Sequence, residues 1–173
     1  ENPKSVYHVG SLGVENIKSI KLLSKIDLQK ELNFKLKKKN VLVTFHPETV
    51  SLVSAKKQIN FIIKALNKLE NVGIIFTKAN ADDGGIIINK EIDKFILLNK
   101  NAVSFTSMGQ LKYFSAIKYI NCVVGNSSSG IIEVPSFGIP TINIGDRQAG
   151  RIQASSVYNV PMNSNCIYKK ISD

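Results

Sequence analysis

The chain has 173 residues, of which 43% are hydrophobic and 21% charged, and its 23 Lys and Arg against 13 Asp and Glu give a formal net charge of +10. This length and composition indicate one soluble globular domain with a core of its own. Apolar runs such as Val41–Val43 and Val72–Phe76 are far too short to cross a bilayer, which excludes a membrane-spanning protein.

Segments with the pattern of buried strands alternate along the chain with segments of helical spacing. We expect strands at 41–45, 72–76, 103–105, 122–124, 141–144 and 157–160, and helices at 51–70, 87–100, 108–120 and 127–137. Such an alternation predicts a Rossmann-like three-layer α/β/α sandwich with a parallel sheet.

The first 40 residues have a different character. They suggest a short strand and turn at 6–11, followed by a largely helical, lysine-rich stretch at 15–37. We interpret residues 1–40 as an interdomain connector with a first helix, and residues 41–173 as the compact Rossmann-like domain. The chain opens with no signal-peptide pattern, and it begins at Glu1 rather than at a methionine, so we expect that an N-terminal portion is missing.

The positive charge raises the question of a nucleic-acid partner. Lysines gather at Lys18, Lys21 and Lys25, which would share a helix face, and within 35–39. The second segment lacks interleaved aromatic residues and flanking glycines, and lysine-rich surfaces are more often solvated faces than binding sites. We expect no nucleic-acid or membrane partner, with nucleic-acid binding as a minor alternative.

Two segments near the C-terminal third suggest an anion site. Gly125–Glu133 has the composition of a strand end, a turn of small residues and a helix start, where backbone N–H groups and the helix dipole favour an anion. Arg147 and Arg151 are the only arginines of the chain, beside 21 lysines. A guanidinium binds phosphate or carboxylate with two parallel hydrogen bonds, which lysine cannot do. Together these features predict a phosphate-bearing ligand.

Ligands of parallel sheets bind at the carboxyl ends of the strands, and five of the expected turns would meet there. His46 follows the first of these strands, where it either hydrogen-bonds a phosphate oxygen or packs against Pro47. One serine of 127–129 is expected to cap the next helix, which leaves at least one hydroxyl for a ligand. Glu133 either accepts hydrogen bonds from vicinal ribose hydroxyls or merely stabilises the helix start.

Other candidate groups have structural explanations. We interpret Asp82 and Asp83, before two glycines, as a turn, and His8 as structural. Cys122 and Cys166 form no C-x-x-C pair, so we expect free thiols in a reducing cytoplasm and no metal site. No strand is followed by G-x-G-x-x-G, so a dinucleotide cofactor is not expected.

The block 126–151, which runs from Asn126-Ser127-Ser128-Ser129-Gly130 to Asp146-Arg147-Gln148-Ala149-Gly150-Arg151, closely resembles the C-terminal half of hydrolysing UDP-N-acetylglucosamine 2-epimerases. His46-Pro47-Glu48-Thr49 resembles that family's His-Pro motif, and Val9-Gly10-Ser11 with Glu15-Asn16-Ile17 resembles its interdomain segment. The resemblance extends over nearly the whole chain. It implies a GT-B-like enzyme of two facing Rossmann-like domains, of which this chain is the C-terminal, nucleotide-binding half.

The resemblance also implies roles for single residues. Ser127 and Ser128 would hydrogen-bond the diphosphate of a UDP-sugar, Glu133 the ribose hydroxyls, and Arg147 a phosphate. His46 would be the catalytic residue, in contact with the diphosphate near the bond that breaks. The Ser107-Met108 loop would present backbone groups to uracil, and Asn80 would contact the nucleotide.

The family reaction eliminates UDP to a glycal and adds water, which gives a free 2-epimerised amino sugar of the kind used in sialic or legionaminic acid biosynthesis. The resemblance implies no metal or redox cofactor, and a possible homo-oligomer for the full-length protein. Since the groups that act on the sugar C2 proton lie mainly in the family's N-terminal domain, which has no counterpart here, we expect this chain alone to be inactive.

Two other functions remain open. A GT-B glycosyltransferase would bind the same donor through a similar turn and glutamate, although that class lacks the Arg-Gln-x-Gly-Arg sequence. A stand-alone binding module would need no second domain. The resemblance leaves the amino sugar undecided between N-acetylglucosamine and N,N'-diacetylbacillosamine.

Overall fold

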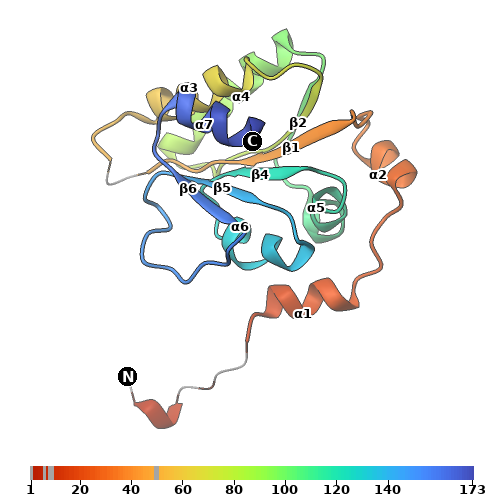
Figure 1. The fold of residues 1–173 in the computed structure, drawn as a ribbon, viewed down its shortest axis with the longest axis vertical. Coiled ribbons are helices and arrows are strands. Elements are labelled where there is room, and N and C mark those ends of the chain that lie inside the picture. The colour runs from red at the N-terminus through yellow and green to blue at the C-terminus, as the bar shows by residue number, and fades with distance from the viewer. Residues whose placement is uncertain (1, 6, 8–9, 49–50) are drawn as a thin grey trace.

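The computed structural model describes residues 2–5, 7, 10–48 and 51–173. The strand and turn expected at 6–11, and the structural role expected for His8, fall in part outside these residues. Within them the chain forms a parallel sheet between two layers of helices (Figure 1). The predicted three-layer sandwich is therefore confirmed.

The strands are β1 (Lys39–Thr44), β2 (Val72–Thr77), β3 (Ala102–Phe105), β4 (Cys122–Gly125), β5 (Thr141–Ile144) and β6 (Val157–Val160). Their order across the sheet is β3-β2-β1-β4-β5-β6, and every neighbouring pair is parallel. The order reverses between β1 and β4, which makes their carboxyl ends a topological switch point.

Helices cover both faces of the sheet. The helices α3 (Ala55–Leu66), α4 (Asp83–Leu98) and α7 (Ser164–Ser172) lie on one face, and α2 (Lys25–Glu31), α5 (Gly109–Ile117), α6 (Ser129–Ile132) and the 3-10 helix η2 (Val134–Phe137) on the other. Two further helices, η1 (Pro3–Ser5) and α1 (Leu12–Ser19), precede them. None of the helices in the described ranges has the length and apolar character needed to cross a membrane.

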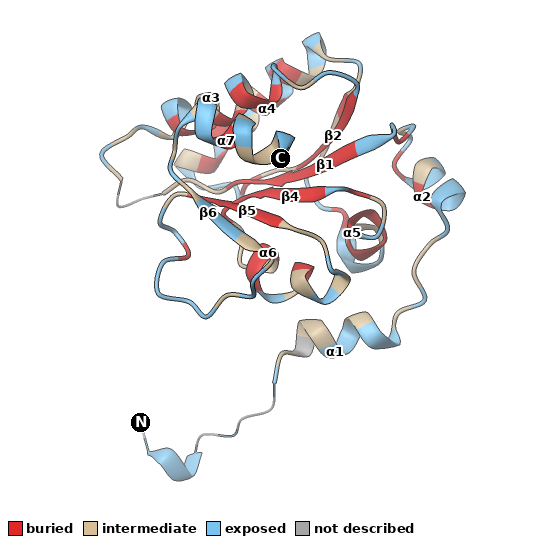
Figure 2. Cartoon of the chain, in the orientation of Figure 1, coloured by how far each residue is buried: buried red, intermediate tan, exposed pale blue. Residues whose placement is uncertain are grey.

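Each face of the sheet contributes to its own hydrophobic core, because strand side chains alternate in direction. Val41, Val43 and Phe76 pack toward α3 and α4, whereas Leu42 and Ile75 pack toward α2 and α5. Figure 2 shows buried residues in red along the central strands and on parts of the helices that cover them. The buried sheet thus holds the loops at its carboxyl edge on a rigid support.

The structure divides the helical stretch expected at 15–37 into α1 and α2. Ser24 caps α2, since its Oγ accepts a hydrogen bond from the Asp27 amide (3.2 Å) and donates one to the Asp27 carboxylate (2.6 Å). Residue Ile20 is already extended, with φ −79° and ψ 127°. The capping serine therefore starts a new helix where the spacing of apolar residues suggested continuity.

The helix expected at 127–137 is also interrupted. The segment forms a single turn of α-helix, α6, followed directly by η2. Pro135 lacks the N–H that a continuing α-helix would require, which explains the break. Because α6 has only four residues, the helix dipole invoked for an anion contributes little here.

Candidate functional site

The candidate site lies at the switch point, where β1 and β4 run side by side. Thr44 pairs with Gly125 at their carboxyl ends, so His46 and Ser127, far apart in the sequence, follow neighbouring strands. Gly125 has φ +140°, and a Cβ there would collide with the Thr44 carbonyl oxygen. Glycine is therefore required where the two strand ends come closest.

Asn126 ties the two loops together. Its fully buried side chain accepts a hydrogen bond from the His46 amide (2.8 Å) and donates one to the His46 carbonyl (2.8 Å). Its own amide donates to the Thr44 carbonyl (3.1 Å). These bonds fix the backbone of His46 against the turn that begins at Ser127.

The loop after β5 is held against the same point. The Arg147 guanidinium donates to the Asn126 carbonyl (3.0 Å), as does the Gln148 side-chain amide (2.8 Å). Glu48, from the His46 loop, accepts hydrogen bonds from the amides of Asp146 (3.0 Å) and Arg147 (3.3 Å). The three loops therefore form one hydrogen-bonded unit around Asn126.

A cavity of about 360 Å³ opens beside this unit. Four predicted residues, His46, Ser107, Met108 and Ser127, line it. Ser129 of the predicted serine turn also lines it. The other lining residues, to which the sequence interpretation gave no individual role, are Thr44, Thr77, Lys78, Gly109, Gln110 and Tyr113. The structure thus brings four of the five predicted strand-end loops to a single concave surface, whereas Ser128, Glu133 and Arg147 are not among its lining residues.

The environment of His46 lowers its pKa from the ordinary value of 6.5. Burial is the largest cause, the nearby Arg147 adds to it, and Asp82 acts in the opposite direction. The imidazole is therefore neutral at pH 7, with one N–H to donate and one nitrogen to accept. His46 lines the cavity, which favours a contact with a ligand over a role limited to packing against Pro47.

The serine turn keeps most of its hydroxyl capacity. Ser128 stands at the N-cap of α6 but makes no capping side-chain bond, and Ser127 Oγ accepts only a long hydrogen bond from the Ser129 amide (3.4 Å). Ser129 Oγ accepts a hydrogen bond from the Tyr113 hydroxyl (2.8 Å). One serine was expected to cap the next helix, but no serine side chain of the turn makes a cap bond to α6 beyond the long bond at Ser127, so the hydroxyls of Ser127 and Ser128 remain available for a ligand.

Glu133 immediately follows α6 and is partly buried. Its Oε2 is fully buried and has no hydrogen-bond partner among the described residues. The carboxylate lies against the backbone of Gly13 in α1, where any larger residue would collide with it. A buried carboxylate oxygen without a donor is costly unless a ligand supplies one.

The remaining predicted residues are placed as follows. Asn80 is exposed in the loop between β2 and α4, at the same edge of the sheet, and is not among the residues that line the cavity. Asp82 caps α4 by accepting a hydrogen bond from the Gly85 amide (2.6 Å). Arg151 is exposed. Within the described parts of the chain, no group of three or more His, Cys, Asp or Glu side chains could hold a metal ion.

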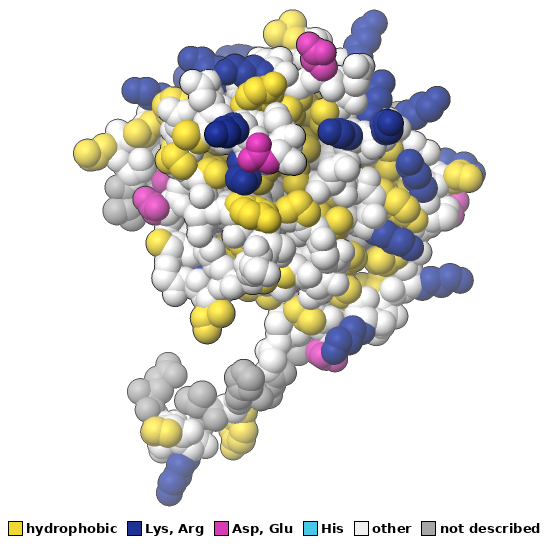
Figure 3. All heavy atoms as spheres, viewed as in Figure 1, with side chains coloured by type: hydrophobic (Ala, Val, Ile, Leu, Met, Phe, Trp, Pro, Cys, Tyr) yellow, Lys and Arg dark blue, Asp and Glu magenta, His cyan; other side chains and the backbone are white. Residues whose placement is uncertain are grey.

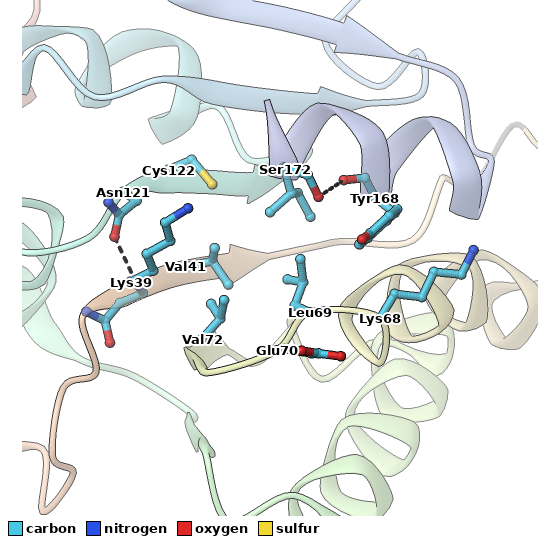
Figure 4. A pocket seen from close by; sticks show the side chains of 12 residues that line it. Lys39, Val41, Lys68, Leu69, Glu70, Val72, Asn121, Cys122, Tyr168 and Ser172 are labelled. Carbon is cyan, nitrogen blue, oxygen red and sulfur yellow. Dashed lines mark hydrogen bonds between the residues drawn. The ribbon is translucent and has the colours of Figure 1, made fainter.

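A second hollow, of about 400 Å³, lies at the opposite, amino edge of the sheet (Figure 4). Lys39, Lys68 and Tyr168 line it, between the ends of α3 and α7. Two pairs of its lining residues bond to each other, since Asn121 accepts from the Asn40 amide (2.8 Å) and Ser172 donates to the Tyr168 carbonyl (2.9 Å). Parallel sheets bind ligands at the other edge, so we assign the site to the carboxyl edge.

The basic residues give no further site on the face drawn in Figure 3. There the Lys and Arg side chains are spread over the surface among hydrophobic and neutral ones, without gathering into one stripe.

Comparison with known proteins identifies relatives along the whole chain. This chain is 42% identical over 164 residues to the hydrolysing GDP/UDP-N,N'-diacetylbacillosamine 2-epimerase of Campylobacter jejuni. The alignment covers 94% of this chain and 43% of the relative. The chain is also 41% identical over 173 residues to polysialic acid biosynthesis protein P7 of Escherichia coli, covering 99% of this chain and 44% of the relative. The chain thus spans less than half the length of these curated relatives.

Solved structures share the fold. The S. aureus MnaA–UDP co-structure superposes with a TM-score of 0.70 at 13% identity, over 99% of this chain and 46% of that one. The model of the family described as UDP-N-acetylglucosamine 2-epimerase matches residues 1–173. Since this match runs from the first residue to the last, the chain belongs to the UDP-N-acetylglucosamine 2-epimerase family.

Proposed function

We propose that this chain is the nucleotide-binding half of a hydrolysing UDP-sugar 2-epimerase, with UDP held in the cavity at the carboxyl edge of the sheet. The observation that carries the proposal is the convergence of His46, Ser127 and Arg147 around Asn126 at the switch point. Hydroxyl, imidazole and guanidinium donors side by side suit the oxygens of a diphosphate.

The residue roles follow the chemistry of each group. The charge of Arg147 helps to lower the pKa of His46, and both residues are bonded to Asn126, so we propose that one diphosphate contacts both. Ser127 and Ser128 offer hydroxyls with little capping duty, and the Ser107–Met108 loop would present its backbone to uracil at the cavity wall. Asn80 is retained as a nucleotide contact only by resemblance.

Glu133 is the proposed ribose ligand. Vicinal ribose hydroxyls are donors, and the buried Oε2 lacks a donor among the described residues. A nucleoside whose hydroxyls point at this oxygen would satisfy it and so recover part of the cost of its burial.

The proposed reaction eliminates UDP from the sugar and adds water, giving a free 2-epimerised amino sugar. The chain's own residues would hold the leaving diphosphate, with the neutral His46 donating its N–H to a phosphate oxygen as negative charge develops there. We propose that residues 1–40 connect this domain to a further one that acts on the sugar C2 proton, as the greater length of the relatives suggests.

The substrate is proposed as UDP-N,N'-diacetylbacillosamine or UDP-N-acetylglucosamine, in sialic or legionaminic acid biosynthesis. The Campylobacter relative is named for the first sugar and the family for the second, and the Escherichia coli relative is named for polysialic acid biosynthesis. The unpaired Cys122 and Cys166 suit a cytoplasmic enzyme.

The alternative is a GT-B glycosyltransferase domain, which would bind the same donor and transfer the sugar to an acceptor. Product analysis of the full-length protein with both UDP-sugars decides between the two. We expect UDP and a free 2-epimerised amino sugar without any acceptor, and strict dependence on an acceptor would overturn the proposal. The 173-residue chain alone is expected to bind UDP and to release none from either donor.

A further inference from the structure

A tyrosine that the sequence interpretation gave no role meets the third serine of the turn at 127–129 at the wall of the cavity. Tyr113 of α5 donates a hydrogen bond from its hydroxyl to Ser129 Oγ (2.8 Å), and both residues line the cavity. Ser128, which the resemblance links to the diphosphate, is not among the lining residues. The cavity wall therefore presents the third serine of the turn rather than the second.

The Tyr113 hydroxyl stays protonated under all physiological conditions. Burial raises its pKa to about 12, the hydrogen bond to Ser129 acts in the opposite direction, and the nearby Glu133 raises it further. A phenol is also a stronger donor than an aliphatic hydroxyl, so Tyr113 supplies the proton of the shared hydrogen bond. Ser129 is thereby fixed as the acceptor.

The Ser129 hydroxyl still has its own proton to donate to a ligand. A serine hydroxyl carries one proton and two lone pairs, and Tyr113 occupies one of the lone pairs. Among the described residues no acceptor takes the Ser129 proton, although the hydroxyl lies at the cavity. A hydroxyl that accepts one hydrogen bond also becomes a better donor in a chain of such bonds.

We propose that Ser129 is a ligand-binding residue that donates its hydroxyl proton to an oxygen of the UDP diphosphate, and that Tyr113 is the residue that positions it. This inference rests on the proposed function. The diphosphate is the strongest acceptor that UDP offers, and Ser129 belongs to the same turn as Ser127 at the switch point. The pair thus adds a relayed donor to the direct donors His46 and Arg147.

A purely structural role for the pair, as a tie between α5 and α6, makes a different prediction. A tie would support the whole cavity wall, so its loss would weaken UDP and uridine alike. A donor to the diphosphate would affect UDP and leave uridine, which has no phosphate, unchanged. The comparison of these two ligands therefore separates the two roles.

The experiment is an NMR titration of the 173-residue chain with UDP and with uridine, for wild type, Ser129→Ala, Tyr113→Phe and the double variant. We expect Ser129→Ala to weaken UDP about tenfold and Tyr113→Phe about threefold, with uridine unchanged. The double variant should match Ser129→Ala within about twofold, because Tyr113 acts through Ser129. Tyr119→Phe is the matched control, since its hydroxyl donates to the Leu23 carbonyl (3.1 Å) away from the cavity.

Wild-type affinity for UDP from Ser129→Ala, or equal losses for UDP and uridine, would overturn the inference while leaving the proposed function intact. Additive effects of the two substitutions would overturn the positioning role of Tyr113. A wild-type chain that binds no UDP would overturn the proposed function itself, and the inference with it.

Discussion

The two edges of the sheet carry hollows of similar size and opposite character. The cavity at the carboxyl edge measures about 360 Å³ and the hollow at the amino edge about 400 Å³. Two buried side-chain oxygens without partners among the described residues, Glu133 Oε2 and Gln148 Oε1, belong to segments that follow β4 and β5 near the carboxyl edge, outside the cavity lining. The hollow at the amino edge is bordered by polar groups that pair with one another. The unsatisfied buried oxygens, rather than the cavity volume, therefore favour the carboxyl edge as the proposed binding edge.

Two buried asparagines have the same structural role at opposite edges of the sheet. Asn126 exchanges two hydrogen bonds with the backbone of His46, and Asn40 exchanges two with the backbone of Lys37. Both are almost completely inaccessible, at 0% and 2% exposure. They form a natural pair of matched variants.

The largest effect is expected from Asn126→Ala. Loss of its side chain leaves the buried His46 amide and carbonyl unpaired, at a cost of about 2–3 kcal/mol in the free energy of unfolding. Asn40→Ala should cost about as much, yet only Asn126→Ala should also weaken UDP, by about tenfold or more. Denaturant unfolding and calorimetric titration measure the two effects. Equal loss of UDP affinity in both variants would break the comparison.

The next effect separates the two arginines. Arg147→Ala removes the charged donor that is bonded to the Asn126 carbonyl, so UDP affinity should fall by about 10- to 100-fold. Arg151→Ala, four residues later, should change it by less than about twofold, because both arginines are exposed but, of the two, only Arg147 is bonded to the Asn126 carbonyl among the described residues. Calorimetric titration with UDP measures both affinities. If Arg151→Ala weakens UDP binding as much as Arg147→Ala, the charge of the loop acts at long range rather than through a direct contact of Arg147.

Glu133→Gln tests the proposed ribose contact with little change of shape. Wild type should prefer UDP over 2′-deoxy-UDP by about fivefold, and the variant should lose most of that preference because the amide accepts less strongly. Glu70→Gln, in the lining of the amino-edge hollow, serves as the control and should keep the preference. If Glu133→Gln keeps the preference for UDP over 2′-deoxy-UDP, the Glu133 carboxylate does not bind the ribose.

The smallest effect concerns pH. Burial and Arg147 lower the pKa of His46 in the folded chain, so near and below pH 6.5 the unfolded chain binds more protons at this residue. Stability from this source is full above pH 6.5 and is lost as the pH falls. The Tm should therefore drop less between pH 7.5 and pH 5.5 in His46→Gln than in wild type or Glu70→Gln. If the Tm of all three proteins falls equally between pH 7.5 and pH 5.5, the pKa of His46 is not lowered in the folded chain.

Much of the fold could be predicted from the sequence, because strands buried on both faces give continuous apolar runs such as Val72–Phe76. The helix boundaries could not be predicted, since they depend on local devices. The Ser24 cap divides α1 from α2, and Pro135 ends α6 after one turn. The spacing of apolar residues gives no sign of either helix end, because it continues through both positions.

The candidate site was predictable where a residue directly follows a strand, as His46 and Ser127 do. Tyr113 and Gln148 could not be found in this way, because their contacts depend on β1 lying beside β4 and on how α5 packs. The one available signal was the polar Tyr113 within an otherwise apolar helix face at 111–117.

The central claim, that UDP occupies the carboxyl edge, is tested most directly by following every backbone amide of the chain during an NMR titration with UDP. We expect saturable shifts at His46, Ser107, Ser127 and Arg147, and no shifts at Lys68, Asn121 and Tyr168. Shifts confined to the amino-edge residues, or no saturable shifts at all, would contradict it.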